Sequence, residues 1–303
     1  MNKIDQAKEY LLKNDIIGIP TETVYGLAAS ILSPKAIDKV FTIKERPSFD
    51  PLIVHVSSVQ QAKEYTEYWD DRCEKLAQAF WPGPLTMILP KSDQISGKIT
   101  AGLETVGIRM PKHDLTLELI KLLGHPIAAP SANKFSKTSP TTAEHVKKSF
   151  PNLFVLDGGP CLVGIESTIV GIHKNQIIIY RPGMISKDEI EKVLDTPVCY
   201  QESPVAPGHL QHHYMPNTPI ITFDSNKKNE LKSMCDPSHL KNPITWKLPS
   251  EAAIAARVLY GKFRSFDNER PSAILIEYDL KQLQDELFSG IFNRLQKAST
   301  FFI

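Results

Sequence analysis

The feature that most constrains the fold of this chain is the alternation of short apolar runs with amphipathic segments over its first 193 residues. The apolar runs have the length of buried strands, and the segments between them have helical spacing. We expect strands at residues 16–19, 52–56, 85–89, 106–110, 127–129, 153–156, 168–172 and 176–180, and helices at 4–14, 33–44, 62–68, 73–80, 115–123, 141–150 and 186–193. Interleaving of this kind predicts an α/β fold, a sheet covered by helices. An apparent hairpin around Lys174-Asn175 makes the sheet mixed.

The composition of the sequence changes between Thr196 and Pro219, where prolines are frequent and the hydrophobic residues follow no helical or strand period. We interpret this stretch as a long ordered linker. The alternation resumes after it, with expected strands at 220–223, 244–246 and 273–278, a charged helix between the first two of these strands, and helices at 250–263 and ending at 293–295. A chain of 303 residues also exceeds the usual size of one domain. We therefore predict a catalytic domain at 1–200, a linker over the active site at 201–219, and a small C-terminal α/β domain at 220–303.

Composition excludes several classes of protein. The 35 Lys and Arg residues balance 34 Asp and Glu residues, so a cationic site must be local, which weakens a general nucleic-acid-binding function. The four cysteines form no C-x-x-C pair, which argues against zinc and indicates small buried side chains in a reducing compartment. No apolar run approaches the roughly 20 residues of a membrane span. We expect a cytoplasmic protein with no membrane partner.

Three common enzyme motifs are missing from the sequence. A phosphate-binding loop needs G-K-S/T, and neither Gly97-Lys98-Ile99 nor Gly261-Lys262-Phe263 supplies it. The dinucleotide motif G-x-G-x-x-G and the hydrolase motif G-x-S-x-G are also absent. The sequence therefore does not support a phosphate-binding-loop protein, a dinucleotide-binding enzyme or a hydrolase with the G-x-S-x-G motif.

Polar clusters follow the predicted strands where each strand ends. They lie at 21–25, 130–133, 166–168 and 181–183. Ligands of open α/β sheets bind at strand ends, so converging clusters would form one site. Lys44 and Arg46, at a helix end and in the turn beyond it, would add two cations for an anion with several charges.

Each of these residues also has an ordinary structural explanation. Thr21, Glu22 and Thr23 could serve turn chemistry, Lys44 and Arg46 could complement a solvated helix end, and His55 could be a satisfied core histidine. Arg109 is harder to dismiss, because an arginine in an apolar strand must be paired or functional. The histidines at 209–213 lack accompanying cysteines or carboxylates, and we predict no metal site there.

Taken together, the motifs resemble those of the YrdC-like family of threonylcarbamoyl-AMP synthases, in the same order along the chain. They are P-T-E-T-V-Y-G-L (20–27), K-x-R-P (44–47), P-L-I-V-H-V (51–56), F-W-P-G-P-L-T (80–86), G-I-R-M-P (107–111), A-P-S-A-N (129–133) with S-P-T (139–141), E-S-T-I (166–169) and R-P-G (181–183). The stretch 207–216 is similar to the linker of the two-domain long form. The resemblance implies a YrdC-like twisted mixed sheet and a small Rossmann-like C-terminal domain.

The resemblance implies a nucleotidyltransferase that makes threonylcarbamoyl-AMP and pyrophosphate from L-threonine, bicarbonate and ATP with Mg2+. This is the first step toward the threonylcarbamoyladenosine of tRNA, and downstream tRNA threonylcarbamoyltransferase proteins would be partners. The residues implied for L-threonine are Thr23, His55, Arg109, Ala129 and Ser167. Those implied for ATP are Lys44, Arg46, Asp50, Thr105, Ser131, Asn133, Ser139, Arg181 and Tyr214, with Lys44 and Arg46 as the catalytic pair.

The implied reaction needs no nucleophilic side chain, because the carboxylated amine of threonine attacks the α-phosphorus itself. Catalysis then consists of alignment and charge stabilisation. The linker, through Tyr214, would act as a lid that excludes water.

The chain departs from the family pattern in two places. Leu27-Ala28-Ala29 lacks the second glycine of the usual G-L-G-A turn. Asp50 stands where the family commonly has asparagine, and its carboxylate either helps to hold Mg2+ or weakens ATP binding.

Two other functions compete with this one. The first is a double-stranded RNA-binding or ribosome-assembly factor, with at most weak RNA binding expected from so neutral a chain. The second is a carbamoyl-transferring relative that starts from carbamoyl phosphate, which would not need the threonine pocket implied by His55 and Arg109.

Overall fold

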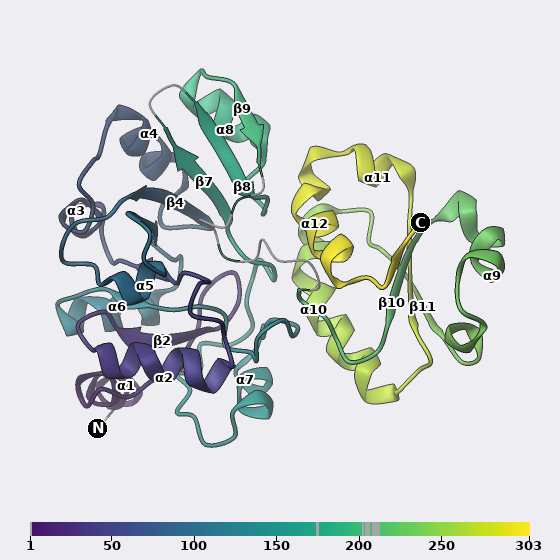
Figure 1. The fold of residues 1–303 in the computed structure, drawn as a ribbon, viewed down its shortest axis with the longest axis horizontal. Helices are drawn as coiled ribbons and strands as arrows, with labels where there is room; N and C mark the ends of the chain where they lie inside the picture. The colour runs from purple at the N-terminus through teal and green to yellow at the C-terminus, as the bar shows by residue number, and fades with distance from the viewer. Residues whose placement is uncertain (1, 174–175, 202, 204–206, 208–212) are drawn as a thin grey trace.

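The computed structural model describes residues 2–173, 176–201, 203, 207 and 213–303, which form two units side by side (Figure 1). The N-terminal unit contains a sheet of nine strands. In spatial order they are β1 (Ile17–Ile19), β2 (Gly26–Ser30), β6 (Ile127–Ala128), β3 (Ile53–His55), β5 (Thr105–Arg109), β4 (Leu85–Pro90), β7 (Thr168–Ile172), β8 (Ile177–Arg181) and β9 (Val198–Tyr200). The pairs β3–β5, β4–β7 and β8–β9 are parallel and the other neighbours antiparallel, so the predicted mixed sheet is confirmed.

Helices cover this sheet, mostly at the positions that the sequence predicts; the short one at Gly97–Thr100 was not predicted, and the helix predicted at 62–68 is observed at Val59–Glu64. The helices are α1 (Lys3–Leu12), α2 (Pro34–Lys44), α3 (Val59–Glu64), α4 (Asp71–Phe80), α5 (Gly97–Thr100), α6 (Asp114–Leu123), α7 (Ala143–Ser149) and α8 (Lys187–Leu194). Helix α2 begins as expected, because the Ser33 hydroxyl accepts a hydrogen bond from the Ala36 amide and Pro34 occupies the first turn. This start fixes where the helix places Lys44, its last residue.

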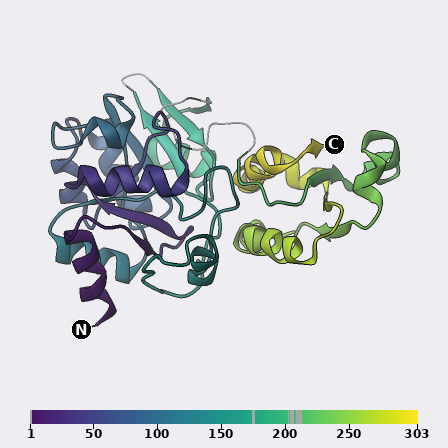
Figure 2. The same ribbon diagram turned by 60° about the horizontal axis from the view of Figure 1, so that its bottom comes forward.

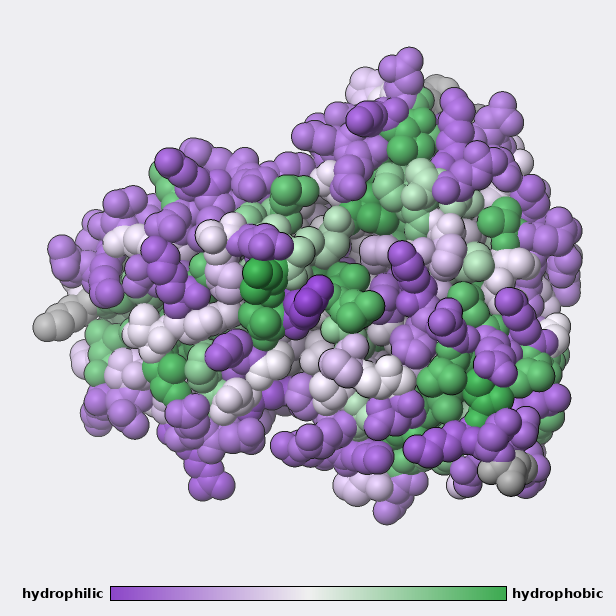
Figure 3. Space-filling model, turned by 180° about the vertical axis from the view of Figure 1, so that it is seen from behind, coloured by the Kyte–Doolittle hydropathy of each residue, from purple (hydrophilic) through white to green (hydrophobic). Residues whose placement is uncertain are grey.

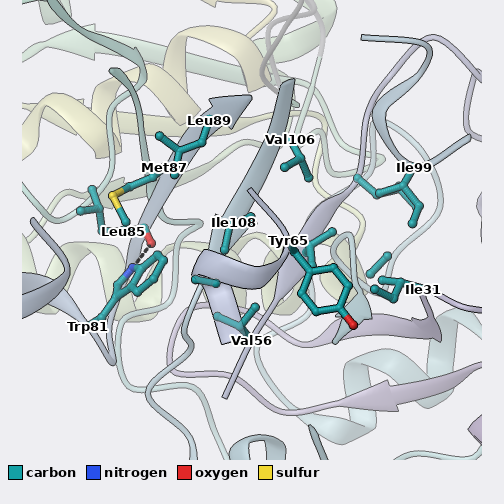
Figure 4. Close-up of a cluster of buried hydrophobic side chains, with 14 of the residues drawn as sticks. Ile31, Val56, Tyr65, Trp81, Leu85, Met87, Leu89, Ile99, Val106 and Ile108 are labelled. Atoms are coloured by element: carbon teal, nitrogen blue, oxygen red, sulfur yellow. Dashed lines mark hydrogen bonds between the residues drawn. The ribbon is translucent and has the colours of Figure 1, made fainter. Parts of the chain in front are cut away.

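Of the three apolar clusters in the described part of the N-terminal unit, one has only three buried residues, Ile53, Ile88 and Ile169, and the other two hold the helices to the sheet. The larger of these two joins the strands β3, β4 and β5 to the helices on one face of the sheet (Figure 4). Within it the Trp81 ring is buried and its Nε1 donates to the Leu85 carbonyl at 2.8 Å, which satisfies its single polar group. The smaller of these two clusters packs α1 and α6 against β1, through residues such as Leu11, Ile17 and Ile120.

The C-terminal unit is a parallel sheet with helical segments on both faces. Its strands, in spatial order, are β11 (Ile244–Lys247), β12 (Ile274–Tyr278), β10 (Ile220–Asp224) and β13 (Phe301–Phe302). Its helices are α9 (Leu231–Met234), α10 (Ala252–Glu269), α11 (Leu280–Gln284) and α12 (Ser289–Ala298), with 3-10 turns at Ser225–Glu230, Pro237–Leu240 and Glu286–Phe288. Ile220 contributes to an apolar cluster with α10 and α12, and Ile221 to one with α9. This is the Rossmann-like arrangement that was expected.

Helices α10 and α12 lie between the small sheet and the N-terminal unit in both ribbon views (Figures 1 and 2). Their apolar cluster includes Val24 and Ile165 from loops of the N-terminal unit. The two units therefore share a buried apolar contact at the loops that carry the predicted polar clusters.

The structure corrects several expectations about single elements. Residues 153–156 form no strand but one bridge, between Val155 and Gly18. Strands β2 and β9 were not expected. The small residues of β2 lack β-branched side chains, and β9 lies in the proline-rich stretch. The predicted charged helix after Phe223 is a 3-10 turn followed by one turn of α9. The expected turn at Lys174-Asn175 lies outside the described residues.

The surface suits a protein in contact with water. Figure 3 shows hydrophilic residues over most of one face of both units, with hydrophobic residues in separate groups between them. Within the described ranges, no helix combines the length and the apolar character that crossing a membrane requires. Cys73, Cys161 and Cys235 are buried, as predicted, whereas Cys199 on β9 is exposed.

Candidate active site

A partly open cavity of about 60 Å³ lies at the strand ends of the N-terminal sheet. Nine of the residues predicted for ligand binding line it: Thr23, Arg46, His55, Arg109, Ala129, Ser131, Ser167, Arg181 and Tyr214. Two of them, Thr23 and Tyr214, lie 191 residues apart in the sequence. The convergence of polar clusters that the sequence predicts is therefore present.

Arg109 forms one wall of the cavity; two of its guanidinium nitrogens donate hydrogen bonds, and the third makes an ion pair but no hydrogen bond to the described residues. Its Nη1 donates to Thr23 Oγ1 at 2.9 Å, and its Nε donates to the Gly83 carbonyl at 3.3 Å. Its Nη2 lies 2.7 Å from Glu22 Oε2 in a buried ion pair. The expectation that a strand arginine must be paired is confirmed, but its partner Glu22 was regarded only as turn chemistry.

His55 lies beside Arg109, because the parallel strands β3 and β5 place the two residues in register. Burial, together with the neighbouring Arg109, lowers the pKa of His55 to about 3. The imidazole is therefore neutral at physiological pH. The neutral His55 imidazole can donate a hydrogen bond to a ligand hydroxyl, or accept one from it, without adding a second positive charge beside Arg109.

Ser167 is held between two neighbours at the start of β7. Its hydroxyl lies 2.7 Å from Thr86 Oγ1 and accepts a hydrogen bond from Arg181 Nη2 at 3.1 Å. Arg181 also donates through Nε to the Ser167 carbonyl at 3.1 Å. Arg181, at the end of β8, therefore fixes the Ser167 hydroxyl where it lines the cavity.

Lys44 does not line the cavity, and the alternative of a solvated helix end is wrong for it. The side chain is 1% exposed, and its Nζ donates to the carbonyls of Ser131 and Asn133, both at 2.6 Å. Burial lowers the pKa of Lys44 well below its usual value. Lys44 supports the loop at 131–133 from behind.

Arg46 does line the cavity, but its charge is already compensated. Its Nη2 lies 3.0 Å from Asp50 Oδ2, and both side chains are buried. Arg46 also donates to the carbonyls of Asp50 and Pro51, at 3.1 and 2.8 Å. Asp50 therefore acts on Arg46 rather than on the cavity itself.

Three further predicted residues lie outside the lining of the cavity. Asn133 donates to the Lys134 and Lys137 carbonyls, both at 2.7 Å, and its Oδ1 has no hydrogen-bond partner. Ser139 donates to Glu166 Oε1 at 2.5 Å. Thr105 lies at the opposite end of β5 from Arg109, away from the cavity.

Glu166 is a functional candidate that the sequence analysis did not identify. It lines the cavity and accepts from Ser139, from Tyr260 OH at 2.9 Å and from Arg294 Nε at 2.9 Å. Burial alone would raise the pKa of this carboxyl, but Arg294 and Arg181 outweigh it and hold the value at about 2. Glu166 is therefore anionic, and two of its partners belong to the C-terminal unit.

His213 and Tyr214, together with Pro207, close the cavity from the linker side. The Tyr214 ring is buried, stacks on Tyr260 with 6.0 Å between centroids, and lies 5.2 Å from the Arg294 guanidinium. Its hydroxyl accepts or donates no hydrogen bond among the described residues and lies near the Arg181 guanidinium. The aromatic face of Tyr214 therefore makes the packing contacts.

Groups of three or more His, Cys, Asp or Glu residues able to hold a metal ion do not occur in the part of the chain that the structure describes. His209 and His212, which belong to the cluster discounted above as a metal site, lie outside that part.

Comparisons with known proteins agree with the two-unit architecture. A family model described as telomere recombination matches residues 9–183, and one described as the threonylcarbamoyl-AMP synthase C-terminal domain matches residues 185–300. The threonylcarbamoyl-AMP synthase of Bacillus subtilis is 44% identical over 74% of this chain and 67% of that protein. The one from Pyrococcus abyssi is 40% identical over 73% of this chain and 68% of that protein. The crystal structure of P. abyssi Sua5 complexed with L-threonine matches with a TM-score of 0.90 and 32% identity, over 100% of this chain and 97% of that one.

Proposed function

This chain belongs to the two-domain family of threonylcarbamoyl-AMP synthases, and on that premise we propose how its cavity divides between L-threonine and ATP. The chain is a nucleotidyltransferase that forms threonylcarbamoyl-AMP. The observation that carries the division is that all five residues predicted for threonine, and four of those predicted for ATP, line one cavity.

The threonine end is the wall made by Arg109, His55, Thr23, Ala129 and Ser167. The guanidinium of Arg109 provides a planar fork for the amino-acid carboxylate. Glu22 Oε2 lies 2.7 Å from Arg109 Nη2, so the substrate carboxylate either displaces Glu22 from the guanidinium or binds the guanidinium beside it. The neutral His55 ring and the Ser167 hydroxyl are suited to the hydroxyl and the amine of threonine.

The nucleotide end contains Arg46, Ser131, Arg181 and Tyr214. Arg46 and Arg181 supply the positive charge for the triphosphate and for the departing pyrophosphate. Lys44 acts through the carbonyls of the 131–133 loop, which it holds in place. Asp50 contacts Arg46 and Ser139 contacts Glu166, while Thr105 lies at the opposite end of β5 from Arg109.

The reaction then requires alignment and not a protein nucleophile. The threonine amine captures the carbon of bicarbonate, water is lost, and a carbamate oxygen attacks the α-phosphorus while pyrophosphate leaves. Fixed cations on both sides of the reacting atoms stabilise the charge that develops on the phosphate oxygens. His55 at the threonine end is neutral, and Glu166 beside the nucleotide end is an anion, so the two ends of the cavity differ in charge.

The carboxylates near the nucleotide end do not fit a Mg2+ site. Asp50 is buried against Arg46, and Glu166 is saturated by Ser139, Tyr260 and Arg294. Mg2+ prefers an octahedral shell of oxygens and commonly keeps several waters. We therefore expect Mg2+ to enter as its complex with ATP, held by the phosphates.

The linker must move before a nucleotide can enter. The cavity of about 60 Å³ is far below the roughly 300–1,000 Å³ of typical ligand pockets. Because Tyr214 closes it with the face of its ring, Tyr214→Ala should raise the ATP KM and increase hydrolysis of the released intermediate, whereas Tyr214→Phe should retain most of the closure. Pyrophosphate release and intact product, measured together, check this. Unchanged turnover and product release in Tyr214→Ala would contradict the lid.

The proposed function is tested by pyrophosphate release from ATP. Release should require both L-threonine and bicarbonate, and mass spectrometry should detect threonylcarbamoyl-AMP. Release supported by carbamoyl phosphate without threonine would favour the carbamoyl-transferring alternative. RNA binding with a steep salt dependence and no such release would favour the RNA-binding alternative. The product is a labile mixed anhydride, so a tRNA threonylcarbamoyltransferase in the same compartment, expected to be the cytoplasm, must consume it.

A further inference from the structure

Three arginines of the C-terminal helices donate hydrogen bonds to backbone carbonyls of the N-terminal unit. Arg257 Nε reaches Leu162 O at 2.8 Å, Arg264 Nη2 reaches Thr138 O, and Arg294 Nη2 reaches Glu166 O at 3.2 Å. The carbonyls of Thr138 and Glu166 directly precede Ser139 and Ser167. The C-terminal unit therefore contacts the loops that carry the site.

Arg294 is the most deeply placed of the three, with 0% of its surface exposed. It bonds to Glu166 Oε2 at 2.9 Å and to the carbonyl of Pro182, the residue after Arg181, and it faces the Tyr214 ring. This single side chain of the C-terminal unit therefore contacts Glu166, the backbone next to Arg181, and the ring of Tyr214.

The backbone packing keeps Arg294 in this position. Gly290, one turn earlier on α12, approaches Gly183 so closely that a Cβ atom on Gly290 would lie 2.6 Å from the Gly183 carbonyl oxygen. Arg294 Nη1 also donates to the Gly290 carbonyl at 3.3 Å. The helix that carries Arg294 therefore rests directly on the loop that follows Arg181.

Electrostatics gives Arg294 a role beyond holding the two units together. Glu166 is an anion in the wall of a cavity that must accept a triphosphate. A buried carboxylate without a counter-charge would repel that ligand and would compete with it for Arg181. Arg294 supplies the counter-charge from the side away from the ligand, and Tyr260 adds a hydrogen bond to the same oxygen.

We propose that Arg294 and Tyr260 of the C-terminal domain are positioning residues for ATP: Arg294 neutralises Glu166, and both residues hold it so that Arg181 and Tyr214 face the triphosphate. This inference rests on the proposed function and adds to it a task for the C-terminal domain. Its consequence is specific: losing Arg294 impairs the nucleotide end and spares the threonine end.

The test compares Arg294→Met with Arg294→Lys, Tyr260→Phe and a matched control, Arg270→Met, at an exposed arginine that ends α10. Arg294→Met should raise the ATP KM by roughly tenfold or more, the size expected for a lost hydrogen bond to a charged group. The KM for L-threonine should stay within about twofold of the starting value, since Arg294 bonds to no side chain of the threonine wall and reaches only the backbone before Ser167. Arg294→Lys and Tyr260→Phe should give smaller shifts in the same direction, and Arg270→Met none.

A second substitution separates charge compensation from a merely structural contact. If the unpaired carboxylate is what harms ATP binding, Glu166→Gln added to Arg294→Met should lower the ATP KM again by several fold. Binding of a non-hydrolysable ATP analogue, followed by calorimetry, should show the same order without relying on turnover.

The outcomes are distinguishable. Equal losses for ATP and threonine in Arg294→Lys and Tyr260→Phe, or no recovery in the double variant, would overturn the inference. Should Arg294→Met fail to fold, Arg294→Lys and Tyr260→Phe decide by the same KM ratio. Absence of threonine-dependent pyrophosphate release from the unaltered protein would instead overturn the proposed function.

Discussion

Charged side chains in apolar surroundings mark the working parts of this protein at the scale of single residues. Arg109 lies in a strand between buried Ile108 and Met110, and Arg294 lies in a helix between Phe292 and Leu295. A buried arginine requires a partner, and the structure supplies Glu22 for the first and Glu166 for the second. The same signal that identified Arg109 could have identified Arg294.

The division of the cavity predicts different kinetic losses for its two ends. Arg46→Ala should raise the ATP KM, and Arg109→Ala should raise the KM for L-threonine, each by roughly tenfold or more, because each removes a charged donor from one ligand. Initial rates with one substrate varied at saturation of the other measure both values. Identical effects of the two substitutions on both substrates would contradict the division.

The Arg46–Asp50 pair predicts a gain of affinity. Asp50→Asn keeps a side chain of the same shape but removes the charge that now compensates Arg46 at 3.0 Å. The ATP KM should fall by roughly three- to tenfold, equivalent to about 0.7–1.4 kcal/mol. Asp50→Ala is the control, since it leaves Arg46 without its partner and should also destabilise the protein. A higher ATP KM in Asp50→Asn would show that the carboxylate contributes to binding.

At the scale of elements, the N-terminus of α2 determines where its last residue, Lys44, lies. Ser33→Ala removes the hydrogen bond that the Ala36 amide donates to the Ser33 hydroxyl at 3.1 Å. The free energy of unfolding should fall by about 1 kcal/mol, as for other N-cap losses. Denaturant titration measures this, with Ser33→Thr as the control that keeps a hydroxyl. A loss as large in Ser33→Thr would assign the effect to packing instead.

Whole-molecule stability should depend on pH through three histidines, of which His55 and His213 are buried and His145 is half-buried. Burial lowers the pKa values of His55 and His213 to about 3 and of His145 to about 4. The folded state keeps them neutral, whereas the unfolded chain takes up protons near pH 6.5. The free energy of unfolding therefore has its full value above about pH 6.5. It falls as the pH drops toward 4, by up to about 1.4 kcal/mol per pH unit for each histidine.

Denaturant midpoints between pH 7 and pH 4.5 check this dependence. His145→Gln should reduce the slope, because one titrating group is removed. The Glu166 carboxylate acts at lower pH, since its pKa of about 2 means that its contribution is complete above about pH 4.5 and is lost only as the pH falls toward 2. A flat profile between pH 7 and pH 4.5 would contradict the neutral state of the histidines.

The sequence by itself determined the local elements, the order of the motifs and the family. Strand and helix periods, the Ser33-Pro34 helix start and the polar clusters at strand ends are all properties of contiguous residues. Short or weakly patterned elements escaped the prediction, as β2 and β9 did, because their few residues carry no period.

Only the tertiary structure decided what each charged group faces. Lys44 binds carbonyls 87 and 89 residues away, and Glu166 pairs with Arg294 across 128 residues. Such pairs arise where separate strands, loops and helices meet, so their geometry depends on the packing of both units and not on any local pattern. For that reason the sequence indicated the residues of a nucleotide site, and the fold decided which of them line the cavity and which support it from behind.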